Sequence, residues 1–140
     1  MKNRNLVHSD SWATPKDFYD KLNEEFRFDF DPCPLHSSFD GLDPLCIWGK
    51  SNFINPPYSQ KLKELFVKRA VEESKKGKIC ICLLPVSTST KLFHDTISPN
   101  AKEIRFIKGR LKFEGINTKG ELVSNKCGMH DSMIVVFRKD

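Results

Sequence analysis

The chain has 140 residues, a formal net charge of +5 at pH 7 and a pI near 9.0. This length predicts one domain over residues 1–140 and leaves little chain for another. The basic charge favours a polyanionic partner, although a merely soluble basic protein would have the same balance. The five cysteines form no Cys-x-x-Cys pair and no apolar leader follows Met1, so we expect a cytoplasmic protein without a metal site or a membrane segment.

The first predicted element is a helix over residues 15–25. Thr14 is a good N-cap, Pro15 suits the first helical position, and Asp17 stands where a capping box has its acid. The apolar stripe that this helix would bury recurs at every fourth residue and consists of Phe18, Leu22 and Phe26.

Residues 26–31 alternate Phe with Arg or Asp, which predicts a strand with three rings on one face and three charged side chains on the other. The strand should end at Asp31-Pro32-Cys33-Pro34, a loop without a Gly-x-Gly pattern. Asp31 could accept a hydrogen bond from a cationic ligand there, or it could cap the next turn.

Turn signals fill residues 36–50, where Asp40-Gly41, Asp43-Pro44 and Gly49 interrupt any long periodicity. A complete strand-helix-strand crossover barely fits in this segment, so we expect a trimmed α/β fold. Trp48 is expected in the core or in the wall of a pocket.

The apolar pair Phe53-Ile54 is followed by Asn55-Pro56-Pro57-Tyr58. Because the two prolines cannot donate backbone hydrogen bonds and hold φ at about −65°, the strand must end here in a stiff loop. Ligands of α/β sheets bind outside the carboxyl ends of the strands. The Asn55 side-chain oxygen and the Pro56 carbonyl could together bond both hydrogens of a planar amino group, and the Tyr58 ring could stack on a base. An ordinary strand-to-helix turn is the alternative.

A second helix should follow, capped by Ser59 and stopped near Gly77. The continuously apolar residues 79–84 predict a central parallel strand that is covered on both faces, and Pro85 should end it. Residues 87–90 offer caps for a short helix that closes at residues 98–100.

The last third predicts strands over residues 103–107, 109–113 and 133–137, added in antiparallel fashion. The expected fold class is therefore α/β, with a mixed sheet flanked by helices. Lys108, Arg110 and Lys112 recur with a period of two, so on a strand through Gly109 they would line one face and could bind phosphates. A solvated strand face is the alternative.

Asn55-Pro56-Pro57-Tyr58 resembles the catalytic motif of S-adenosylmethionine-dependent amino-group methyltransferases, a class that includes adenine N6, some cytosine N4 and protein-glutamine enzymes. Over residues 12–137, the order and spacing of the motifs are similar to those of the phage-type DNA N6-adenine methyltransferase family. The motifs that carry this resemblance are Trp12-x-Thr14-Pro15, Phe28-Asp29-Phe30-Asp31-Pro32-Cys33, Asn55-Pro56-Pro57-Tyr58-Ser59, Leu83-Leu84-Pro85 with Ser89-Thr90 and Phe93-His94, and Gly109-Arg110-Leu111-x-Phe113.

The resemblance implies a trimmed Rossmann-like class I methyltransferase, which transfers a methyl group from S-adenosylmethionine to the N6 amino group of a flipped adenine in DNA. It implies the catalytic residues Asn55, Pro56, Pro57 and Tyr58. The cofactor-binding residues would be Trp12, Thr14, Pro15, Asp31, Cys33 and Asp40. The DNA-binding residues would be Ser59, Lys108, Arg110 and Lys112.

The resemblance implies DNA as the partner, without a metal or a membrane, and allows a homodimer. It implies a location in the cytoplasm of the bacterial host of a phage or prophage. Two alternatives remain open at this point. A protein-glutamine or RNA methyltransferase would use the same tetrapeptide, and a non-catalytic DNA-binding remnant of the fold would result if the shortened cofactor segment does not close a pocket.

Overall fold

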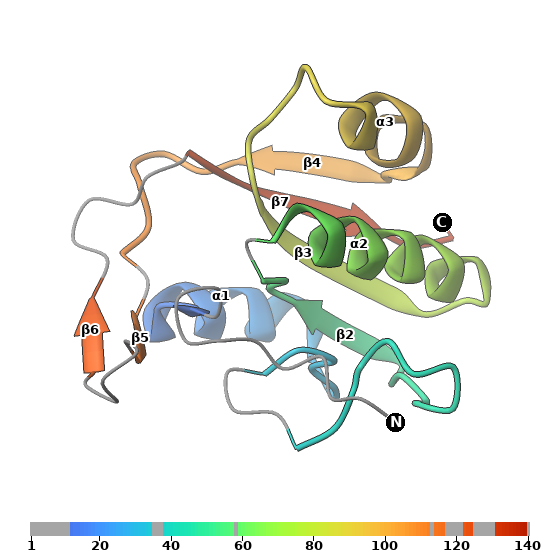
Figure 1. Cartoon of the computed structure of the whole chain (residues 1–140), viewed down its shortest axis with the longest axis horizontal. Coiled ribbons are helices and arrows are strands. Elements are labelled where there is room, and N and C mark those ends of the chain that lie inside the picture. Colours follow the sequence, from blue (N-terminus) through green and yellow to red (C-terminus); the bar gives the residue numbers. More distant parts are fainter. Residues whose placement is uncertain are drawn as a thin grey trace.

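The computed structural model describes residues 12–34, 38–57, 59–112, 114–116, 122–124 and 131–139. A four-stranded mixed sheet forms its centre, with β2 (Ser51–Ile54) beside β3 (Ile79–Pro85), then β7 (Ser132–Phe137) and β4 (Glu103–Phe106) (Figure 1). β2 and β3 are parallel, whereas β7 is antiparallel to both of its neighbours. The prediction of a mixed α/β sheet with antiparallel C-terminal strands is confirmed.

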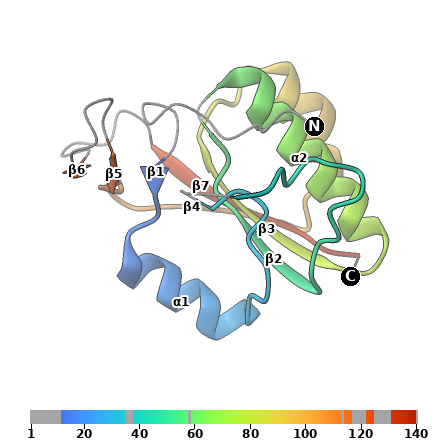
Figure 2. The same ribbon diagram turned by 60° about the horizontal axis from the view of Figure 1, so that its bottom comes forward.

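Helices cover both faces of this sheet. α1 (Lys16–Phe26) lies on one face, and α2 (Gln60–Lys75) lies on the other face with the π-helical segment η2 (Leu92–Ile97) and the short α3 (Ser98–Asn100) (Figure 2). A second, three-stranded sheet joins distant parts of the chain, because β1 (Trp12–Ala13) pairs with β5 (Glu114–Ile116), which pairs with β6 (Leu122–Ser124). The sequence patterns did not predict this small sheet.

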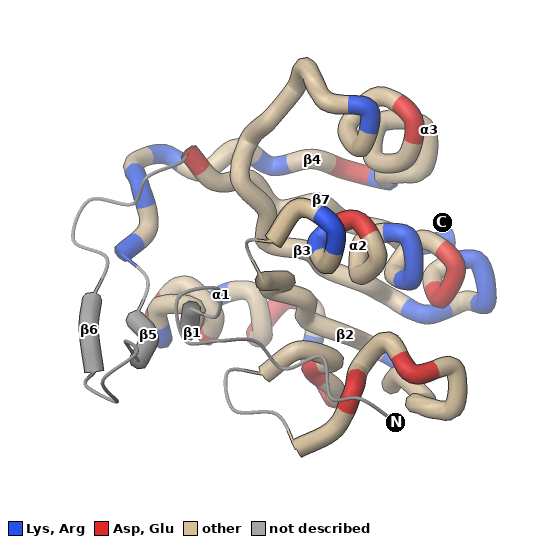
Figure 3. The backbone as a smooth tube through the Cα atoms, viewed as in Figure 1, with Lys and Arg blue, Asp and Glu red and all other residues tan. Residues whose placement is uncertain are grey.

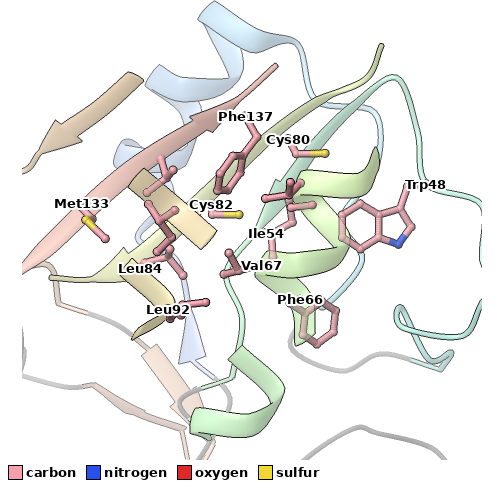
Figure 4. Close-up of a cluster of buried hydrophobic side chains, with 14 residues drawn as sticks. Trp48, Ile54, Phe66, Val67, Cys80, Cys82, Leu84, Leu92, Met133 and Phe137 are labelled. Carbon is pink, nitrogen blue, oxygen red and sulfur yellow. The ribbon is translucent and has the colours of Figure 1, made fainter. Parts of the chain in front are cut away.

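The alternation of side chains along β3 explains its continuous apolar sequence. Cys80, Cys82 and Leu84 belong to the larger core cluster, which lies under α2 and η2 (Figure 4). Ile81 and Leu83 belong to a second cluster with the apolar side chains of α1. A strand that buries both of its faces needs apolar residues at every position, so the prediction of a central covered strand is confirmed.

The predicted capping of α1 is wrong. The helix begins at Lys16, and no side chain caps its first turn. The Thr14 hydroxyl is engaged elsewhere, because it accepts a hydrogen bond from the side-chain amide of Asn55 at 3.0 Å. Ser59 likewise precedes α2 without a side-chain capping bond. Of the predicted caps, the one at Thr90 before η2 is present, because the Thr90 hydroxyl accepts the Phe93 N–H at 3.2 Å.

The strand predicted over residues 26–31 is reduced to a single parallel bridge between Phe30 and Asn52. Arg27 follows α1 in the left-handed conformation, with φ at 53°, and ends the helix there. Residues 27–29 have no regular secondary structure, and Phe28 packs with the α1 cluster, whereas Phe30 packs with the α2 cluster. The prediction that the three aromatic rings share one face is therefore wrong.

The strand predicted over residues 109–113 is also wrong where the structure describes it. β4 ends at Phe106, and Gly109 has a φ of 78°, which a regular strand does not accommodate. Lys108, Arg110 and Lys112 are exposed on an irregular segment, so they do not line one face of a strand. Phe113 lies outside the described residues.

Glu73 is a buried acid on α2 that the sequence patterns did not single out. Its carboxylate is 2.7 Å from the Lys78 ammonium, 2.8 Å from the Arg69 guanidinium and 3.2 Å from the Lys76 ammonium. Burial by itself would raise the pKa of Glu73, but the hydrogen bonds from these three cations outweigh it and lower the pKa to about 2. Ionised Glu73 therefore stabilises the folded chain.

We expect Glu73→Gln to lower the free energy of unfolding by about 3 kcal/mol at pH 7. The lowered pKa gives stability that is present above the ordinary pKa of 4.5 and is lost as the pH falls toward 2. The difference from the parent protein should thus shrink to less than half by about pH 3. Urea unfolding at several pH values measures it, with the exposed neighbour Glu72→Gln as a control that should change stability by less than about 0.5 kcal/mol. A loss that is the same at every pH would contradict the assignment.

Candidate active site

A pocket of about 190 Å³ lies beyond the carboxyl end of β2. Three segments that are distant in sequence meet there: the residues before α1, the loop after Phe30, and the residue that follows β2. The side chains and backbone that line it belong to Ala13, Thr14, Tyr19, Asp31, Cys33, Pro34, Phe53 and Asn55. Four of the residues that the motifs singled out therefore lie in one pocket, namely Thr14, Asp31, Cys33 and Asn55.

Asn55 is held from both walls of this pocket. Its side-chain Nδ2 donates to the Thr14 Oγ1 at 3.0 Å, and its backbone carbonyl accepts the Cys33 thiol at 3.3 Å. Pro56 is buried and Pro57 is partly buried, so the loop that follows is packed as well as intrinsically stiff. Tyr58 lies outside the described residues.

Asp31 is the acidic group of this pocket. Its Oδ1 accepts the Cys33 backbone N–H at 2.9 Å, which closes a tight turn. Burial raises the pKa of Asp31 to about 6, although the Cys33 N–H opposes this effect. A carboxyl that pays a desolvation cost to ionise will gain strongly from a cationic ligand, because the ligand replaces the lost solvation.

The other two titratable groups that line the pocket, Cys33 and Tyr19, stay neutral near pH 7. Burial raises the pKa of the Cys33 thiol well above its ordinary value, and the nearby Asp31 and Cys82 raise it further. Burial also raises the pKa of Tyr19, followed by the charges of Asp31 and Asp20. Cys33 therefore serves as a hydrogen-bond donor to Asn55 and not as a nucleophile.

A second pocket of about 310 Å³ lies beside the first, and Asp40 lines this one instead. Its lining consists of Phe30, Phe39, Asp40, Asp43, Leu45, Cys46 and Ile47. The loops of the two pockets touch, because a Cβ atom on Gly41 would lie 1.8 Å from the carbonyl oxygen of Pro32. Only glycine fits at that contact. Trp48, expected in the core or in a pocket wall, is buried in the core.

Among the described side chains that the motifs singled out, those of Pro15 and Ser59 line neither pocket. Pro15 precedes α1 and Ser59 precedes α2. The backbone of Trp12 pairs with Gly115 in the small sheet, and its side chain is outside what the structure describes. Basic residues follow one another along the segment that leaves β4 (Figure 3), and Lys108, Arg110 and Lys112 are not among the lining residues of either pocket.

Sequence reasoning missed several lining residues. Tyr19 was one of the helix residues outside the predicted apolar stripe, and Phe53 was read as an ordinary strand residue. Phe39 and Asp43 had no signal beyond a turn-rich composition. Within the described ranges, no three His, Cys, Asp or Glu side chains gather as a metal ion would require. No described helix is long and apolar enough to cross a membrane.

This arrangement defines an α/β protein with one pocket at the carboxyl end of β2 and a second pocket lined by Phe30 and by residues of the segment before β2. The chain belongs to the DNA N-6-adenine-methyltransferase (Dam) family, whose model matches residues 3–140. The resemblance inferred from the motifs is thereby confirmed. A DNA N-6-adenine-methyltransferase of Escherichia phage T1 is 30% identical over 113 residues, which cover 73% of this chain and 46% of the relative. This chain thus spans about half the length of that relative. No solved structure matches the chain.

Proposed function

We propose that residues 1–140 form one trimmed Rossmann-like class I methyltransferase domain, which transfers a methyl group from S-adenosylmethionine to the N6 amino group of adenine in DNA. The observation that carries this proposal is the meeting of Asn55, Asp31 and Thr14 in one pocket beyond β2. Family membership supports the reaction class. The pocket supports it independently, because an amide acceptor and an ionisable acid lie together at the ligand edge of the sheet.

The donor sets of the two pockets fit the two halves of S-adenosylmethionine. In the first pocket, the Asp31 carboxylate would hold the ammonium of the methionine part, with Thr14 and Cys33 beside it. In the second pocket, apolar walls suit a purine ring, and Asp40, which lines this pocket, would bind the ribose hydroxyls. We assign Trp12 and Pro15 to the same cofactor edge because both lie within two residues of Thr14. When bound, S-adenosylmethionine supplies a methyl group that its sulfonium already activates.

Asn55 would then place the target amino group. The Thr14 hydroxyl holds the Asn55 Nδ2, which directs the side-chain oxygen of Asn55 away from Thr14. That oxygen and the Pro56 carbonyl would accept the two amino hydrogens and stabilise the positive charge that develops on the nitrogen. Pro57 keeps the loop rigid, and Tyr58 would stack on the base after it leaves the duplex, a step that costs a few kcal/mol.

The methyl acceptor is tested directly by supplying the parent protein with radiolabelled S-adenosylmethionine and separate DNA, RNA and protein fractions. The expected product is N6-methyladenine in DNA, identified by mass after digestion to nucleosides. Label that enters only RNA or protein-glutamine would overturn the choice of substrate. Absence of cofactor binding would instead identify the chain as a non-catalytic member of the family. The same assay on separated oligomers tests whether a homodimer is the active form.

Phosphate binding is assigned to Ser59, Lys108, Arg110 and Lys112. The three basic side chains are exposed, and an irregular segment can follow a DNA backbone as well as a strand can. Arg110 is 3.2 Å from Asp131, but both side chains are more than half exposed, so this ion pair is weak and can yield to a phosphate.

We expect Arg110→Ala to reduce the slope of log affinity against log salt by about one unit, with little change in sequence preference. Each phosphate contact releases condensed counterions from DNA, and the variant loses one such contact. Fluorescence anisotropy with duplex DNA at several salt concentrations measures the slope. Lys75→Ala, an exposed change at the far end of α2, is the charge-matched control and should leave the slope as in the parent protein. Identical slopes for the two variants would show that Arg110 contacts no phosphate.

A further inference from the structure

The wall of the second pocket is built from a segment without regular secondary structure. Residues 38–50 contain neither helix nor strand, yet Asp43 and Cys46 line the pocket. Two successive turns shape the segment, because the Asp43 N–H donates to the Asp40 carbonyl at 3.0 Å and the Cys46 N–H donates to the Asp43 carbonyl at 2.8 Å. Such local bonds give the wall its shape, but they do not attach it to the rest of the protein.

Arg69 on α2 provides an attachment. Its Nη2 donates to the Cys46 carbonyl at 2.6 Å, and its Nη1 donates to the Asp43 carbonyl at 3.2 Å. Its guanidinium also lies over the Trp48 ring, 5.1 Å from the ring centroid. The Arg69 side chain thus contacts the segment that forms the pocket wall at three residues, Asp43, Cys46 and Trp48.

Arg69 is itself oriented by buried charge. Its Nε donates to the Glu73 carboxylate at 2.8 Å, one helical turn along α2. α2 is anchored to the sheet by buried side chains that include Phe66, Val67, Ala70 and Val71. Because a guanidinium is planar and has five donors in fixed directions, it can bond the carboxylate and two carbonyls at once, which a lysine ammonium on a flexible stem does poorly.

We propose that Arg69 is a positioning residue for the cofactor, which fixes the wall of the second pocket in the geometry that receives the adenosine part. This inference rests on the proposed function. Its physical basis is preorganisation, since a segment that is already ordered in the free protein loses little entropy when the ligand binds. Arg69 itself does not line the pocket, so it acts through Asp43, Cys46 and Trp48.

Arg105→Ala offers a matched control for Arg69→Ala. Arg105 on β4 also pairs with carboxylates, those of Glu25 at 2.6 Å and Glu103 at 2.8 Å, and its guanidinium lies 5.4 Å from the centroid of the Phe26 ring. Both changes thus remove an arginine with ion pairs and a cation–π contact. Of these two arginines, only Arg69 hydrogen-bonds the pocket wall.

The experiment titrates S-adenosylhomocysteine into the parent protein and both variants by calorimetry, well below their unfolding temperatures, and follows amide hydrogen exchange over residues 38–48. Arg69→Ala should weaken binding by about tenfold and speed exchange of the Leu42 and Cys46 amides. Arg105→Ala should change neither quantity. At saturating cofactor and DNA, Arg69→Ala should keep its turnover within about twofold of the parent rate, because Asn55 is untouched.

Parent-like affinity in Arg69→Ala would overturn the inference while leaving the proposed function intact, and so would an equal loss of affinity in Arg105→Ala. No binding by the parent protein would instead overturn the proposed cofactor and the inference with it. If Arg69→Ala does not fold, Arg69→Lys takes its place, because it keeps the charge beside Glu73 without bonding both carbonyls. Parent-like affinity in Arg69→Lys would then overturn the inference.

Discussion

Asn55→Ala should lower the single-turnover rate of methyl transfer by about a hundredfold or more, while cofactor and DNA binding persist. The reason is that the Asn55 side-chain oxygen meets a positive charge that develops only on the way to the transition state. An interaction of that kind changes the rate and leaves the affinity of the ground state largely unchanged. The assay follows transfer to unmethylated duplex DNA and identifies the methylated nucleoside by mass.

Substitutions at Tyr58 separate placement of the amino group from capture of the base. Tyr58→Ala removes a stacking surface worth on the order of 1–3 kcal/mol per base, so both base capture and turnover should weaken. Tyr58→Phe keeps the ring and should retain much of the activity. Methyl transfer by Asn55→Ala at the parent rate would refute the assigned role, and methylcytosine as the product would refute the choice of adenine.

Asp31→Asn should weaken S-adenosylhomocysteine binding by roughly 10- to 100-fold at pH 7.5, because a charge-assisted hydrogen bond to the ligand ammonium becomes a neutral one. The asparagine oxygen can still accept the Cys33 N–H, so the turn is kept. Since the pKa of Asp31 is about 6, the parent affinity should rise as the pH increases through 6, where the carboxyl ionises. The affinity of the variant should not change over this range.

The same substitution should have the opposite effect on stability. The folded-state pKa of Asp31 is raised from 3.8 to about 6, so burial disfavours the ionised form, and the parent protein loses stability as the pH rises between these values. Asp31→Asn avoids this loss, so its free energy of unfolding at pH 7 should exceed that of the parent protein by roughly 1–3 kcal/mol. Weaker binding together with undiminished stability would identify Asp31 as a ligand group.

Calorimetric titrations from pH 5 to pH 8 and urea unfolding measure these two effects. Asp29→Asn is the matched control, since Asp29 lies two residues earlier, outside the pocket, and its carboxylate accepts the Ser51 N–H at 3.1 Å. The control should bind S-adenosylhomocysteine as the parent does at every pH. An affinity of the parent that does not change with pH would remove Asp31 from the cofactor site.

Several features of this protein follow from its sequence alone, because their causes are local. Proline has no N–H and a fixed φ, so Pro56 and Pro57 end β2 in any context. A run as apolar as β3 must be covered on both faces. The order of the motifs also suffices for the family, since the match extends over residues 3–140. The motifs therefore pointed to Thr14, Asp31, Cys33 and Asn55 of the first pocket, but not to Tyr19 or Phe53.

Tertiary contacts decided the rest. The Thr14 hydroxyl could cap α1 or bond Asn55, 41 residues away, and only the packed chain determines that it bonds Asn55. The chain between α1 and the bridge at Phe30 is irregular, so Phe28 and Phe30 pack into different core clusters despite their alternating pattern. Asp40 lines a second pocket. Arg69 on α2 hydrogen-bonds the wall of that pocket through backbone carbonyl groups, which every residue type carries. Backbone acceptors leave no trace in a sequence, so contacts of this kind appear only once the chain has folded.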